Sequence, residues 1–165
     1  MIQKKICMLG AFAVGKTSLV KRYVHSIFSD KYLSTVGVKL DKKTVKVGGQ
    51  EVMLMLWDLY GEDGFQKVQL NYLKGSSGFL LIVDGTRLST LTTGLELRKT
   101  VHEVTGPIPY IMVINKCDLR ADWEVRTQLI DELRGRGEHI ILASAKTGEG
   151  VEEAFLGLSE RMLKA

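Results

Sequence analysis

The chain has 165 residues, a length that suits one domain, residues 1–165, with a hydrophobic core of its own. Hydrophobic residues make up 45% and charged residues 25%, which excludes a disordered or fibrous chain. The net charge of +4 gives no sign of nucleic-acid binding, and two cysteines far apart in the sequence argue against a disulfide-rich secreted protein, so we expect a cytoplasmic one.

Apolar runs alternate with stretches of helical pattern, which predicts an α/β fold with a mainly parallel sheet. The expected strands cover residues 2–9, 38–47, 52–57, 78–83, 110–114 and 139–142. The turn at Gly48 and Gly49 predicts a hairpin between the second and third strands, which makes the sheet mixed. The last three runs are continuously apolar, and we expect them to be central strands.

Helical patterns fill the spaces between these runs. The expected helices cover residues 16–24, 66–73, 91–104, 123–134 and 151–163. The last is the clearest because its apolar residues share one helical face: Val151, Ala154, Phe155, Leu158 and Met162. We expect this helix to pack on the sheet.

The segment GAFAVGKT, residues 10–17, follows the first strand and has the phosphate-loop pattern G-x-x-x-x-G-K-[ST]. Gly10 and Gly15 allow the backbone to approach phosphate oxygens, and the N–H groups that begin the next helix face the negative charge. Lys16 is expected to reach the β- and γ-phosphates, and the Thr17 hydroxyl to bind Mg²⁺. Neighbouring residues expected to contact the nucleotide are Ala13, Val14 and Ser18. The alternative is a glycine-rich turn that only begins a helix.

Polar segments at later strand ends are candidates for base recognition. In NKCD, Asp118 can accept hydrogen bonds from guanine N1–H and the 2-amino group, a pair that adenine lacks. Asn115 can bond the base or tie this loop to the phosphate loop, and the Lys116 stem can cover the ring. In SAK, residues 144–146, the N–H of Ala145 can donate to guanine O6. Residues expected to bind the nucleotide from this second segment are Ser144, Ala145 and Lys146.

Two further positions are candidates for the metal and the γ-phosphate. Asp58 begins DLYG at the end of the third strand, where a carboxylate can hold Mg²⁺ through water while the Gly61 N–H meets the γ-phosphate. Thr35 is a candidate for the remaining Mg²⁺ contact, although a threonine at such a place is commonly just a solvated loop residue.

Taken in order, GAFAVGKT, Thr35, DLYG, NKCD and SAK resemble the nucleotide-binding motifs of Ras-superfamily small GTPases along the whole chain. TVGVKL, and Trp57 before DLYG, are more similar to the Rab branch than to others. The resemblance implies a P-loop NTPase G domain, with six mostly parallel strands flanked by five helices, and GTP or GDP with Mg²⁺ as ligands. It also implies that Phe28 lies against the edge of guanine, although its segment equally allows burial in the core.

The chain departs from the family pattern around the γ-phosphate. Glu62 stands where the family has a glutamine that orients the attacking water, and a carboxylate cannot donate to developing charge and repels phosphate. With Lys16 and Gly61 as the other catalytic residues, we expect slow hydrolysis, unless Glu62 acts as a general base. Phe12 and Tyr60 are bulkier than the family's usual residues and either crowd the γ-phosphate or are simple packing residues.

The resemblance implies a monomeric guanine-nucleotide switch. Effectors, exchange factors and GTPase-activating proteins are expected to bind through the loops 28–38 and 58–72. The chain ends without a cysteine and has no glycine after Met1, so we expect no direct membrane anchor in it. Alternatives are a GTP-locked binding or scaffold module with little hydrolysis, and a P-loop kinase or ATPase in which NKCD and SAK are coincidental.

Overall fold

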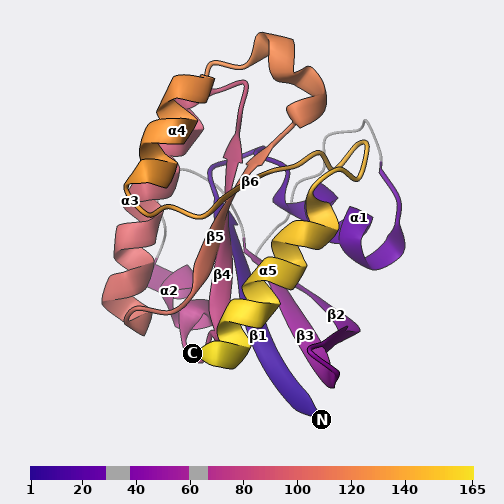
Figure 1. The fold of residues 1–165 in the computed structure, drawn as a ribbon. Helices are drawn as coiled ribbons and strands as arrows, with labels where there is room; N and C mark the ends of the chain where they lie inside the picture. Colours follow the sequence, from indigo (N-terminus) through magenta and orange to yellow (C-terminus); the bar gives the residue numbers. More distant parts are fainter. Residues whose placement is uncertain (29–37, 60–66) are drawn as a thin grey trace.

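The computed structural model describes residues 1–28, 38–59 and 67–165, and the statements below concern this part of the chain (Figure 1). Six strands form one sheet in the order β2-β3-β1-β4-β5-β6. Their bounds are β1 Ile2–Gly10, β2 Val38–Val47, β3 Gln50–Leu59, β4 Gly78–Asp84, β5 Tyr110–Asn115 and β6 Ile140–Leu142. Only β2 and β3 pair antiparallel, and the other described pairs are parallel, which confirms the predicted mixed sheet.

Five α-helices and one 3-10 helix accompany the sheet in the described residues. They are α1 Lys16–His25, α2 Lys67–Leu73, α3 Leu88–Thr105, the 3-10 helix η1 Cys117–Asp122, α4 Thr127–Gly135 and α5 Val151–Lys164. Helices α1 and α5 cover one face of the sheet, and α2, α3 and α4 cover the other (Figure 1). None of these helices is long and apolar enough to cross a membrane.

The two layers of the core follow from the alternation of side chains along each strand. In β4, Leu80 and Ile82 face α1 and α5, whereas Phe79, Leu81 and Val83 face α3 and α4. All seven residues of β4 are buried, as its continuous apolar sequence predicts for a central strand.

Two predictions about elements are wrong. The run 139–142 was expected in the centre of the sheet, but β6 is a three-residue edge strand in which Ile141 and Leu142 are only partly buried. The helix expected over 123–134 begins instead at Thr127, because η1 precedes it and Trp123 is buried in the connection. Apolar content indicates burial, but it does not tell an edge strand covered by helices from a central one.

The opposite edge strand, β2, is ten residues long and carries four lysines. Lys39, Lys42 and Lys46 are exposed, whereas Lys43 turns inward, where its Nζ donates to the carbonyl oxygen of Tyr23 (2.6 Å) and lies 3.9 Å from the centroid of the Tyr23 ring. The strand is thus mainly a solvated edge with one lysine fastened to α1.

Candidate functional site

The segment between β1 and α1 forms a tight loop whose backbone requires small residues. Gly15 has a left-handed φ of 102°, and Ala13 also adopts a left-handed φ of 60°. A Cβ at Gly15 would lie 2.3 Å from Asn115 Nδ2, so no larger residue fits there without moving Asn115. The loop therefore curls against the end of β5, the arrangement that a backbone cradle for phosphate needs.

Lys16 follows this loop and folds back over it. Its ammonium is buried and donates to the carbonyl oxygens of Gly10 (3.0 Å) and Ala11 (3.2 Å). Burial lowers the pKa of Lys16 to about 8; Asp58 opposes this shift, and the charge of Arg87 adds to it. A buried cation whose charged form is disfavoured suits an anionic ligand, because a phosphate in the loop would favour the protonated lysine.

Two of the three predicted metal ligands, Thr17 and Asp58, meet at the start of α1. Thr17 Oγ1 donates to Asp58 Oδ2 at 2.6 Å, and Asp58 is 1% exposed at the end of β3. A hydroxyl and a carboxylate oxygen side by side are hard ligands that fit Mg²⁺. No cluster of three or more His, Cys, Asp or Glu side chains forms a metal site in the described part of the chain. Thr35 and Gly61, the other predicted contacts, lie outside the described residues.

Asn115, the last residue of β5, joins three loops. Its Nδ2 donates to the carbonyl oxygen of Val14 (3.0 Å), and its Oδ1 accepts from the N–H of Ala145 (3.3 Å). Two roles were considered for Asn115, and this hydrogen bond to Val14 is the one that links its loop to the phosphate loop. Val14 is itself buried in the core, and Ser18 lies in the first turn of α1.

Asp118 and the SAK segment lie together at the exposed end of the site. Ser144 Oγ donates to Asp118 Oδ1 (2.7 Å) and accepts from the Thr147 N–H (3.1 Å). Arg22 of α1 donates to the carbonyl oxygens of Ala145 (2.7 Å) and Lys146. These bonds fix the orientation of a carboxylate that remains exposed and able to meet a ligand.

Two functional candidates were missed at the end of β4. Asp84, 1% exposed, accepts from Lys116 Nζ (2.7 Å) and Arg87 Nε (3.0 Å). Burial tends to raise the pKa of Asp84, but hydrogen bonds, that of Lys116 first, hold the pKa below its usual value. The available signal was that Asp84 is a charged residue ending an apolar strand, as Asp58 is; nothing in the sequence singled out Arg87.

Lys116 is held in place on the other side of the loop as well. It adopts a left-handed φ of 73°, and its Nζ lies 3.4 Å from the Ala13 carbonyl oxygen. Its own carbonyl accepts from Trp123 Nε1 (2.8 Å), and the Trp123 ring covers Gly85, where a Cβ would lie 2.1 Å from a ring carbon. Residues 115–118, which we call the base-side loop, therefore rest on a tryptophan packed against the end of β4.

The structure describes only some of the residues that depart from the family pattern. Phe12 is 41% exposed and Phe28 is 38% exposed, so neither side chain is buried in the core. Tyr60 and Glu62 lie outside the described residues, as do residues 29–37 of the first proposed partner loop and residues 60–66 of the second.

Comparison with known proteins gives a consistent result. The model of the Ras family matches residues 5–164. Ras-related protein Rab-13 of Bos taurus is 30% identical over 161 residues, covering 96% of this chain and 79% of that protein. Ras-related protein Rab-32 of Homo sapiens is 34% identical over 169 residues, covering 96% and 74%, and Ras-related protein Rab-21 of Dictyostelium discoideum is 32% identical over 167 residues, covering 96% and 76%.

Proposed function

The chain belongs to the Ras family of small GTPases and resembles its Rab-related members, and on this premise we propose that it is a single-domain, monomeric guanine-nucleotide switch. It binds GTP or GDP with Mg²⁺ and hydrolyses GTP slowly to GDP and phosphate. Loss of the γ-phosphate then changes the loops that partners recognise.

One observation carries the proposal more than any other: the phosphate loop and the base-side loop are joined by direct bonds. Asn115 bonds the Val14 carbonyl, and Lys116 bonds both Asp84 and the Ala13 carbonyl. Two motifs about a hundred residues apart thus lie side by side, with the Lys16 ammonium at the phosphate loop and the Asp118 carboxylate in the other motif. A guanine nucleotide matches this polarity because it has phosphates at one end and N1–H and 2-amino donors at the other.

Each residue has a distinct part in binding. Gly10, Ala13 and Gly15 present backbone N–H groups to the phosphates, and Lys16 neutralises β- and γ-oxygens. Thr17, Asp58 and Thr35 would hold Mg²⁺, which supplies charge neutralisation at the β- and γ-phosphates when bound. The base is held by Asp118, with Lys116, Ser144, Ala145 and Lys146 around it and Phe28 at its edge.

Glu62 sets the expected rate. A carboxylate beside the γ-phosphate cannot donate to charge that develops in the transition state, and it repels the phosphate oxygens. Hydrolysis is therefore slow in the chain alone, and a GTPase-activating protein is expected to supply the positive charge of an arginine in trans. Exchange factors and effectors would engage residues 28–38 and 58–72.

A single-turnover assay with the full chain tests the proposal. The protein is loaded with GTP and Mg²⁺, GDP is followed by chromatography, and ATP loading is the control. We expect GTP to bind in preference to ATP and to be hydrolysed below about 10⁻⁴ per second, the scale of an unassisted small GTPase. Tight GTP binding with no turnover would favour the GTP-locked module, and equal binding of ATP would contradict guanine recognition by Asp118.

A further inference from the structure

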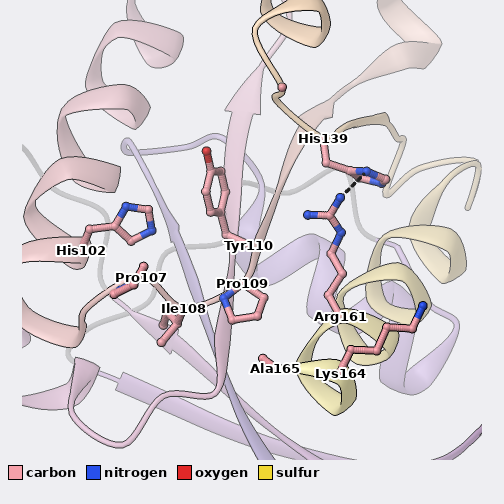
Figure 2. Close-up of a pocket in the computed structure, with 10 residues that line it drawn as sticks. His102, Pro107, Ile108, Pro109, Tyr110, His139, Arg161, Lys164 and Ala165 are labelled. Atoms are coloured by element: carbon pink, nitrogen blue, oxygen red, sulfur yellow. Dashed lines mark hydrogen bonds between the residues drawn. The ribbon is translucent and has the colours of Figure 1, made fainter.

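A cavity lies at the end of the sheet where the parallel strands begin, opposite to the end that carries the phosphate loop. It is a cavity of about 510 Å³ between the start of β5, the connection before β6 and the C-terminal ends of α3 and α5 (Figure 2). The phosphate loop follows the C-terminal end of β1, whereas this cavity, which we name the basal pocket, adjoins Tyr110 at the N-terminal end of the parallel strand β5. The basal pocket is therefore separate from the nucleotide site.

The charged side chains that line the basal pocket are basic. Arg161 and Lys164 are its charged side chains, the histidines His102 and His139 stand beside them, and no acidic side chain lines it. The adjacent acid, Glu138, is already engaged: it accepts from Tyr110 Oη (2.6 Å) and forms an ion pair with Arg98. Arg161 and Lys164 are therefore not matched by an acidic side chain in the lining.

The contact between Arg161 and His139 strengthens this conclusion. Arg161 Nη2 lies 2.9 Å from His139 Nδ1, and because a guanidinium only donates, the imidazole nitrogen must accept (Figure 2). A ring that accepts through Nδ1 is neutral and carries its hydrogen on Nε2. Burial and the charges of Arg161 and Arg134 lower the pKa of His139, which favours this neutral form. Arg161 thus keeps its full charge and remaining N–H groups, and His139 retains a further donor.

Much of the remaining wall is apolar and partly buried. Pro107, Ile108 and Pro109 form the turn before β5, and the Tyr110 ring stacks on Phe79 with centroids 4.9 Å apart and an angle of 9°. The Arg161 guanidinium lies between Tyr110 and His139, and Lys164 extends from the same end of α5 (Figure 2). A charged group with a small organic body suits such a mixture of donors and apolar wall.

We propose that the basal pocket binds the phosphate group of a phosphate monoester, with Arg161 as the main contact and His139 and Lys164 as additional donors. A phosphate fits better than a carboxylate, because its three terminal oxygens can accept from a planar guanidinium, an imidazole N–H and an ammonium in different directions. The proposal depends only on residues at this edge and stands apart from the proposed guanine-nucleotide switch.

A titration observed by NMR tests it, with glycerol 3-phosphate added to the isotope-labelled full chain. We expect saturable shifts at the amides of Tyr110, Gly137 and His139. Arg161→Gln should weaken this binding about tenfold, as expected for loss of a charged hydrogen bond. Arg126→Gln removes an exposed arginine that does not line the pocket and should change nothing. Unchanged spectra elsewhere in Arg161→Gln would show that the variant is folded.

A second arm separates a soluble ligand from a lipid headgroup of the same chemistry. Phosphatidylcholine vesicles with and without phosphatidic acid are sedimented with the wild-type chain and with Arg161→Gln. Sedimentation that needs both phosphatidic acid and Arg161 supports the proposal with a lipid as the source. Shifts confined to residues 10–17, equal binding by Arg161→Gln, or no saturable binding in either arm would overturn it, whether or not the chain binds GTP.

Discussion

Arg87 Nη2 donates a 2.8 Å hydrogen bond to the carbonyl oxygen of Phe12, while its Nε bonds the buried carboxylate of Asp84 at 3.0 Å. One side chain at the start of α3 therefore holds the outer part of the phosphate loop to the end of β4. Since Asp84 also binds Lys116, the contact continues to the base-side loop.

Replacing Arg87 should weaken the binding of the nucleotide. In Arg87→Gln we expect GDP to dissociate up to about tenfold faster, because a charged hydrogen bond to the loop is lost, with solvent exposure limiting the effect. The dissociation rate of a fluorescent GDP analogue measures this. Arg136→Gln, at an exposed position on the far end of α4, is the matched control. Equal rates in wild type and Arg87→Gln would show that the contact does not restrain the loop.

The packing of Trp123 on Gly85 should be intolerant of one extra methyl group. In Gly85→Ala the new Cβ would lie 2.1 Å from the indole ring, so the ring must move. We expect a loss of about 1–3 kcal/mol in the free energy of unfolding, the usual cost of overpacking. Urea denaturation followed by tryptophan fluorescence measures it. Gly135→Ala adds the same methyl where nothing lies within 4 Å, and should not be destabilised.

Changing Glu62 to the amide separates two mechanisms. If the carboxylate hinders hydrolysis, Glu62→Gln should hydrolyse bound GTP about tenfold faster, because the amide can orient water and donate to developing charge. If Glu62 is a general base, the same variant should be slower. Single-turnover rates with GTP decide between them, and a slower Glu62→Gln would contradict the proposed slow switch.

His139 should make stability depend on pH. Its pKa is lowered in the folded chain, so the unfolded chain binds the proton more readily. The contribution of His139 to stability is thus complete above about pH 6.5, and it is lost as the pH drops toward the lower pKa of His139 in the folded chain. We expect Arg161→Gln to raise the pKa of His139 in an NMR titration of the imidazole. Stability of His139→Gln should vary less between about pH 5 and 7, and an unchanged profile would refute the assignment.

Much of the candidate site was predictable, because the carboxyl ends of parallel strands meet at one edge of a sheet. This rule brings the phosphate loop, Asp58 and Asn115 together from sequence order alone. The Asp84–Arg87–Lys116 network was not predictable, because it depends on which side chains turn toward one another after packing. The late start of α4 likewise depends on the burial of Trp123, since residues 123–126 include no glycine or proline that would exclude them from a helix.

The lysines along β2 affect how copies of the chain meet one another. Strand edges expose unpaired N–H and C=O groups that can extend a sheet from one molecule to the next. Two β2 edges placed side by side would bring the exposed lysines of the two copies, Lys39, Lys42 and Lys46, near one another. The resulting charge repulsion opposes such pairing, and raising the salt concentration would weaken this protection against aggregation.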